Sequence, residues 1–191
     1  MSKVVVITGV PGSGKTTVVR QALEVLKQQG IEYEVVNYGD VMLELMRERL
    51  GVTHRDDMRK IDTGVYREIQ REAGKKIADI AKQKRVIVDT HCFVKKPEGY
   101  YPGLPLWVLQ ELRPDVLVLV EATPQEIARR RTLDADRKRD RELEQSIQEH
   151  QEFNRMVAMA YSAISGAAVR IVTNHDDRLN EAVEQMISVL R

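Results

Sequence analysis

The sequence predicts an α/β protein in which five parallel strands form one sheet that helices cover on both faces. Short apolar, β-branched runs alternate with amphipathic helical patterns along the chain, as parallel strands joined by crossovers require. The first run, Val4–Thr8, also leads directly into a glycine-rich loop that a helical pattern follows. Ligands of such sheets bind beyond the carboxyl ends of the strands. Functional residues are therefore expected in the loops at that edge.

Strands are expected where continuous apolar runs, rich in valine and isoleucine, lie between turn residues. In chain order these runs are Val4–Thr8, 33–36, 85–89, 115–121 and 169–173. The segments between them carry apolar residues at intervals of three and four, which is typical of helices with one buried face. They predict helices at 15–29, 40–50, 55–83 with an interruption near 64, 107–112, 123 onward, 142–165 and 178–190.

Residues at the helix ends support these boundaries. Gly30 is suited to end the first helix, and Asp40 can cap the second. Thr123 and Glu126 have the spacing of a capping box, with a proline between them in the first turn. The segment 91–105 contains three of the six prolines and is expected to be an ordered loop.

Composition limits the class of protein. A chain of 191 residues with 42% hydrophobic residues suits a single domain, 1–191, with a substantial core. The net charge of +1 gives no general attraction to nucleic acid or to a membrane, and no apolar stretch approaches the length of a membrane span. A lone cysteine, Cys92, fits a reducing compartment and is expected to be an inert hydrophobe. We expect a cytoplasmic protein without a cleaved leader, a nucleic-acid partner or a membrane partner.

The glycine-rich loop after the first strand has the G-x₄-G-K-T pattern of a phosphate-binding P-loop. Gly9, Gly12 and Gly14 permit left-handed backbone angles, so that N–H groups can point at phosphate oxygens at the positive end of a helix. Lys15 adds a charge for the β- and γ-phosphates, and Thr16 a hydroxyl for Mg²⁺. The segment expected to hold ATP comprises Gly9, Val10, Pro11, Gly12, Ser13, Gly14, Lys15, Thr16 and Thr17. The fold expected is thus of the P-loop NTPase type.

Asp89 ends the third apolar run, where a carboxylate in P-loop proteins holds Mg²⁺ directly or through water. A helix cap or turn residue is the alternative role. His91 lies two residues later and is suited either to contacting substrate or to a structural hydrogen bond. Thr16 and Asp89 are therefore the candidate metal ligands.

Two segments have the character of insertions into the sheet protein. The first, about 38–83, contains spaced arginines that can clamp a second phosphorylated substrate. Taken alone, these arginines fit a solvated helix with ordinary surface residues better. The second, about 132–141, belongs to a run of seven basic and three acidic residues from 129 to 141. Such a run is usually a solvated face. On a closing lid, however, Arg137 and Arg139 would supply cations to the transferring phosphoryl group.

The chain resembles the archaeal-type adenylate kinases nearly from end to end. Besides the P-loop, the resemblance rests on Asn-Tyr-Gly-Asp at 37–40, Arg-Asp-Asp-Met-Arg-Lys at 55–60 and Val-Asp-Thr-His at 88–91. It continues with Pro-Glu-Gly-Tyr-Tyr-Pro-Gly-Leu-Pro at 97–105 and Arg-Lys-Arg-Asp at 137–140. The P-loop alone is widespread, whereas the segments at 55–60 and 99–105 are far more specific.

The resemblance implies the reaction ATP + AMP ⇌ 2 ADP with Mg²⁺, and assembly as a homotrimer. It places Gly39, Asp40, Arg59 and His91 on the AMP side. Lys15 and the transfer-zone arginines Arg130, Arg137 and Arg139 are the implied catalytic residues. The lid differs from the family pattern, since Asp136 and Lys138 stand where threonine and asparagine are expected. Both lid arginines are kept, and the lid has no four-cysteine zinc site.

Several alternatives remain open at this point. The same architecture serves kinases of CMP, UMP or GMP, and an adenylate-kinase-like ATPase of ribosome assembly would need a basic surface that the net charge does not favour. A GTPase would need Asn-Lys-x-Asp, where the chain offers only Asn174-His175-Asp176. The apolar circumference of helix 142–165 fits either a subunit interface or an internal core helix.

Overall fold

The computed structural model describes residues 3–58, 60–96, 99–133 and 144–191. Its main sheet has five parallel strands in the order β2-β3-β1-β6-β7. They span β1 Val4–Thr8, β2 Glu34–Asn37, β3 Val86–Asp89, β6 Val116–Glu121 and β7 Ala168–Thr173. This sheet confirms the predicted fold class, and strand boundaries differ from the predicted ones by a single residue.

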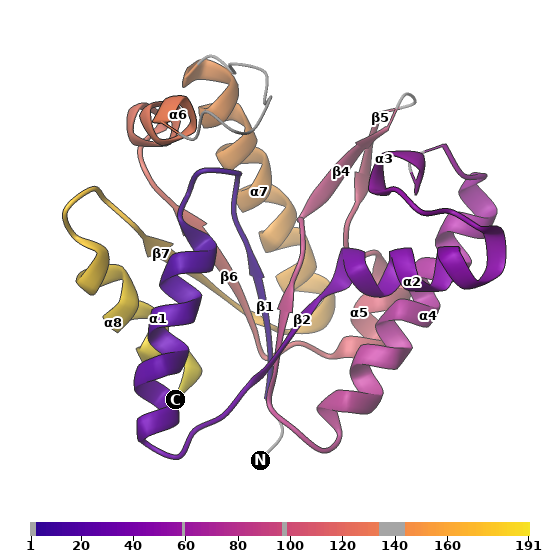
Figure 1. The fold of residues 1–191 in the computed structure, drawn as a ribbon, viewed down its shortest axis with the longest axis horizontal. Helices are drawn as coiled ribbons and strands as arrows, with labels where there is room; N and C mark the ends of the chain where they lie inside the picture. Colours follow the sequence, from indigo (N-terminus) through magenta and orange to yellow (C-terminus); the bar gives the residue numbers. More distant parts are fainter. Residues whose placement is uncertain (1–2, 59, 97–98, 134–143) are drawn as a thin grey trace.

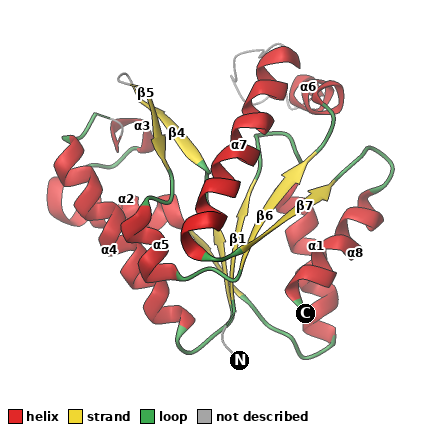
Figure 2. Cartoon of the chain, turned by 180° about the vertical axis from the view of Figure 1, so that it is seen from behind, coloured by secondary structure: helices red, strands yellow, loops and turns green. Residues whose placement is uncertain are grey.

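Helices cover both faces of the sheet, as Figures 1 and 2 show from opposite sides. The helices are α1 Lys15–Gln28, α2 Tyr38–Leu50, α3 Arg55–Met58, α4 Thr63–Ala81, α5 Leu106–Leu112, α6 Pro124–Leu133, α7 Glu144–Ser165 and α8 Leu179–Leu190. Successive strand residues point to opposite faces. Val5 and Ile7 accordingly pack in a core with α1 and α8, whereas Val4 and Val6 pack in a core with α2, α4 and α5. No helix in the described ranges is long and apolar enough to cross a membrane.

The segment expected to be a loop at 91–105 instead contains an antiparallel hairpin, β4 Phe93–Lys96 and β5 Gly99–Pro102. Rings of the hairpin pack against α7: the centroids of Phe93 and His150 lie 4.8 Å apart, and those of Tyr100 and Phe153 5.5 Å apart. The prolines and glycines of this segment led to the loop prediction, which was wrong for 93–96 and 99–102. The hairpin itself is stabilised by ring contacts with a helix some fifty residues later, which local patterns do not reveal.

The cap of α2 also differs from the prediction. Asp40 lies inside the first turn, and Asn37 is the cap, with its side-chain oxygen accepting a hydrogen bond of 3.1 Å from the Asp40 N–H. The helix begins earlier than expected because it follows β2 without an intervening loop. At the start of α6 the predicted capping box is confirmed, since Thr123 N–H donates to Glu126 and Glu126 N–H donates to the Thr123 hydroxyl.

Helix α7 is buried along one side and exposed along the other. One side packs inside the protein, where Ile147, Ala158 and Tyr161 are buried. The opposite side leaves large apolar side chains in solvent, with Met156 64% exposed and Met159 58% exposed.

Candidate functional site

The candidate site lies at the carboxyl edge of the sheet, where the loops after β1, β2 and β3 meet (Figure 1). The order β2-β3-β1 makes the ends of these three strands neighbours, with Asn37 paired to Asp89 and Asp89 paired to Ile7 in the strand register. The P-loop residues predicted from the sequence are thereby placed beside the predicted metal ligand.

Two of the three P-loop glycines have the left-handed backbone that was expected. The φ angle is 88° at Gly12 and 81° at Gly14. Gly9 does not have a positive φ angle, and the expectation for it was wrong. Gly9 is needed for close packing instead, because a Cβ there would lie 2.7 Å from both the Ser13 hydroxyl and the Val120 carbonyl oxygen.

Lys15 and Asp89 form an ion pair across the strand ends, the Lys15 Nζ donating to Asp89 Oδ1. Asn37 Nδ2 donates to the other carboxylate oxygen over 3.4 Å. Thr16 is exposed in the first turn of α1, next to this pair. A hydroxyl and a carboxylate are oxygen ligands of the kind that Mg²⁺ accepts together with substrate phosphates. No cluster of three or more acidic, histidine or cysteine side chains suited to a metal occurs among the described residues.

His91 lies in the loop after β3, where part of the residue reaches solvent and neighbouring groups of the site surround the rest. Loss of surrounding solvent lowers the pKa of His91, and the nearby Lys15 ammonium lowers it further. Both effects favour a neutral imidazole at this edge of the site.

Gly39 and Asp40 lie in the first turn of α2, directly after β2. Arg55, from α3, donates to Asp40 Oδ1 over 2.5 Å and to Asn37 Oδ1 over 2.9 Å. The structure therefore gathers Asn37 and Arg55 with the predicted acceptor-side residues and singles out Arg55 among the spaced arginines of this insertion. Both residues lie in the segments 37–40 and 55–60 that carry the family resemblance, and this position is the sequence signal that could have identified them as site residues. The predicted residue Arg59 lies outside the described residues.

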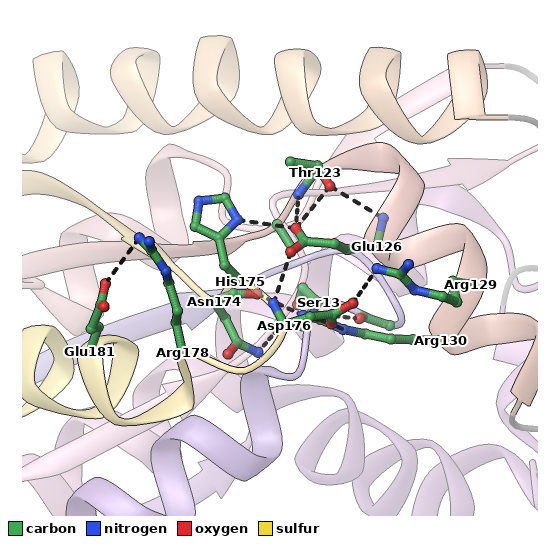
Figure 3. Close-up of polar contacts among 12 residues, drawn as sticks. Ser13, Thr123, Glu126, Arg129, Arg130, Asn174, His175, Asp176, Arg178 and Glu181 are labelled. Atoms are coloured by element: carbon green, nitrogen blue, oxygen red, sulfur yellow. Dashed lines mark hydrogen bonds and ion pairs between the residues drawn. The ribbon is translucent and has the colours of Figure 1, made fainter.

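Arg130 contacts backbone carbonyl groups of the P-loop (Figure 3). It donates to the carbonyl oxygens of Gly12 and Ser13, each over 3.4 Å, and to the Asn174 carbonyl over 2.8 Å. Asp176 accepts hydrogen bonds from Arg130 Nε at 2.8 Å and Nη2 at 2.6 Å. The hydrogen bond from Arg130 lowers the pKa of Asp176, so the carboxylate is ionised and orients the guanidinium. The other predicted transfer arginines, Arg137 and Arg139, lie outside the described residues.

Glu126 connects α6 to the turn after β7 (Figure 3). One carboxylate oxygen accepts from the Thr123 N–H and hydroxyl, each at 2.8 Å, and the other from the Asp176 N–H at 2.8 Å. His175 Nδ1 lies 3.1 Å from the same carboxylate. Desolvation raises the pKa of Glu126, but these hydrogen bonds outweigh it and lower the pKa to about 2. Glu126 thus fixes the position of the turn that holds Arg130.

Comparisons with known proteins show the family to which the chain belongs. A family model described as AAA domain matches residues 8–148. The chain is 53% identical to a curated adenylate kinase of Methanopyrus kandleri, covering 100% of this chain and 99% of the relative. It is 51% identical, with the same coverage, to an adenylate kinase of Methanocaldococcus jannaschii. A crystal structure of shikimate kinase from Bacteroides thetaiotaomicron shares the fold, with a TM-score of 0.53, 16% identity and 98% of each chain covered. With about half of its residues identical to these relatives over its whole length, the chain belongs to the adenylate kinase family.

Proposed function

We propose that this protein reversibly transfers a phosphoryl group from ATP to AMP, giving two molecules of ADP. The observation that carries the proposal is the meeting of the P-loop lysine, an acidic strand end and an arginine-bearing segment at one edge of the sheet. This meeting occurs in a chain that is about half identical, from end to end, to relatives named adenylate kinase.

ATP would bind with its phosphates on the backbone N–H groups of the P-loop at the start of α1. In the structure Lys15 pairs with Asp89, and a phosphate bound on the P-loop would compete with that carboxylate for the ammonium group. Asp89, once released, and the Thr16 hydroxyl would hold Mg²⁺ together with phosphate oxygens. When bound, this ion neutralises charge on the phosphates. Lys15 then stabilises the negative charge of the transferring group, which is the main catalytic task in phosphoryl transfer.

AMP would bind on the opposite side of Lys15, in the insertion at 38–83. Gly39, Asp40, Arg59 and His91 are the proposed acceptor-side residues, and the position of Arg55 beside Asp40 adds it to this group. The lid at about 132–141 would bring Arg137 and Arg139 to the phosphoryl group when both nucleotides are present and would exclude water. Arg130, held by Asp176, is the third transfer-zone arginine.

We assign the whole chain, 1–191, to one kinase domain that acts in the cytoplasm as a homotrimer. The exposed methionines on the outer side of α7 support a subunit interface there, since exposed apolar side chains that gather on one helix favour association. Light scattering coupled to size-exclusion chromatography of the intact chain measures the assembly mass. A monomer at micromolar concentration would contradict the trimer.

A coupled assay of transfer from ATP to AMP, CMP, UMP and GMP tests the activity. We expect AMP to be the preferred acceptor and transfer to require Mg²⁺. A clear preference for another nucleoside monophosphate would establish the alternative kinase activity. ATP hydrolysis without transfer to any acceptor would favour the ATPase of ribosome assembly.

A further inference from the structure

The turn after β7 contacts the P-loop with a buried polar side chain. Asn174 is 6% exposed, and its Nδ2 donates a hydrogen bond of 2.8 Å to the carbonyl oxygen of Ser13, 161 residues earlier (Figure 3). The amide also occupies the space beside Gly14, where a Cβ would lie 2.2 Å from Asn174 Nδ2. From the sequence alone, Asn174-His175-Asp176 is only an incomplete guanine-binding motif.

The hydrogen bond to Ser13 fixes the direction of the peptide group that joins Ser13 to Gly14. The peptide is trans, since no described peptide bond is cis, and its carbonyl and N–H therefore point to opposite sides of the chain. The Ser13 carbonyl points at Asn174 and, more distantly, at Arg130. The Gly14 N–H consequently points away from this turn. Gly14 is the N-cap of α1 and supplies no side-chain cap, so the helix terminus is open to an anion.

We infer that Asn174 is a positioning residue of the triphosphate site, holding the Ser13–Gly14 peptide so that the Gly14 N–H faces the phosphates of ATP. This inference rests on the proposed use of the P-loop as the ATP site. Without the amide, the Ser13 carbonyl keeps only the longer hydrogen bond from Arg130, so the peptide before the left-handed Gly14 is held less firmly and part of the ATP binding energy is spent on ordering it.

Contacts within the protein scaffold hold Asn174 in place. Its N–H donates to the Glu121 carbonyl at 2.8 Å, and its own carbonyl accepts from Arg130 at 2.8 Å. Glu126 holds the backbone of the same turn two residues later, through the Asp176 N–H. The side-chain amide is therefore oriented by the scaffold, as a positioning group must be.

Asn174→Ala and Asn174→Asp test the inference, because alanine removes the amide, and aspartate keeps its shape but replaces the donor with a negatively charged acceptor. Asn180→Asp and Asn180→Ala are matched controls on the exposed first turn of α8. We expect both Asn174 variants to raise the dissociation constant of AMP-PNP by about tenfold, the effect of one lost hydrogen bond to a buried partner. Affinity for AMP should change less than twofold. Calorimetric titration of each variant with each nucleotide measures these values.

The amide resonance of Gly14 provides a readout that a purely structural role would not change. In the wild-type protein its proton signal should move downfield when AMP-PNP binds, and in both Asn174 variants that movement should fall by at least half. The Asn180 variants should behave as wild type.

Wild-type affinity for AMP-PNP in both Asn174 variants, or an unaltered response of Gly14, would overturn the inference. Equal weakening of AMP-PNP and AMP binding together with a lower Tm would assign Asn174 a structural role and would also overturn it. Failure of the wild-type protein to bind AMP-PNP would refute the P-loop as the ATP site. By contrast, AMP-PNP binding by a wild-type protein that transfers no phosphate to AMP would refute only the proposed activity.

Discussion

Replacing Glu126 by glutamine is expected to destabilise the folded protein near neutral pH and to have much less effect in acid. The side chain of Glu126 is 13% exposed, and its carboxylate accepts hydrogen bonds from Thr123 and from the Asp176 N–H. Glutamine has nearly the same shape but lacks the negative charge. It offers one acceptor oxygen in place of two.

The magnitude follows from the pKa of Glu126. Folding lowers this pKa from 4.5 to about 2, and the ionised carboxylate therefore stabilises the folded state at neutral pH by about 3 kcal/mol. Because the pKa is lower in the folded state, this stabilisation is complete above pH 4.5 and is lost as the pH falls toward 2. Less than half of it, roughly 1.4 kcal/mol, remains at about pH 3.

Urea unfolding of wild type and Glu126→Gln at pH 7 and pH 3 measures the difference directly. We expect a loss of about 2 to 3 kcal/mol at pH 7 that shrinks to about 1 kcal/mol at pH 3. Glu184→Gln, an exposed residue on α8, is the matched control and should change stability little at either pH. An equal loss for Glu126→Gln at both pH values would refute the electrostatic reasoning and indicate that shape alone matters at this position.

Further predictions concern the reacting groups and the thiol. Lys15→Ala should abolish phosphoryl transfer in the coupled assay while leaving the circular dichroism spectrum unchanged, and an active variant would contradict the P-loop assignment. Asp89→Asn should raise the Mg²⁺ concentration needed for half-maximal rate, because the amide cannot hold the metal by charge; an unchanged requirement would assign Asp89 a structural role. Arg139→Ala should lower kcat on the order of 10³-fold with little change in nucleotide affinity, whereas Lys138→Ala should have little effect. Equally mild effects of both substitutions would identify the charged residues from 129 to 141 as a solvated face. Desolvation raises the pKa of Cys92 to about 12 and outweighs the opposite effect of a hydrogen bond with the Thr8 side chain. Iodoacetamide should therefore label Cys92 at pH 8 only after unfolding, and rapid labelling of the native protein would contradict its burial.

The elements that the sequence predicted best are those that local interactions determine. The continuous valine-rich run Val4–Thr8 forms a buried strand in any parallel sheet, and Thr123 needs only Glu126 to complete its capping box. The P-loop was recognisable because phosphate binding requires its glycines, lysine and threonine at this fixed spacing. The positions of Gly9 to Thr17 as ligands of ATP remain a prediction.

What the sequence did not predict depends on contacts between distant residues. The hairpin at 93–102 requires the rings of α7, and the pairing of Arg55 with Asp40 requires a turn between α2 and α3 that has no strong pattern. Asn174 is an ordinary turn residue until the sheet brings it against Ser13. Local periodicity carries no information about such pairs, since they are set by the strand order.

The place of β1 in the sheet has a consequence for the chain as it is synthesised. β1 is hydrogen-bonded between β3 and β6, both of which follow it by more than seventy residues. The Ser13 carbonyl accepts a hydrogen bond from Asn174, which is synthesised later still. A nascent chain that has emerged only through the glycine-rich motif thus lacks the neighbours that shape it. Nucleotide binding should reach full affinity only after the last strand has left the ribosome. ATP would therefore stabilise the chain late in folding and would not direct its early steps.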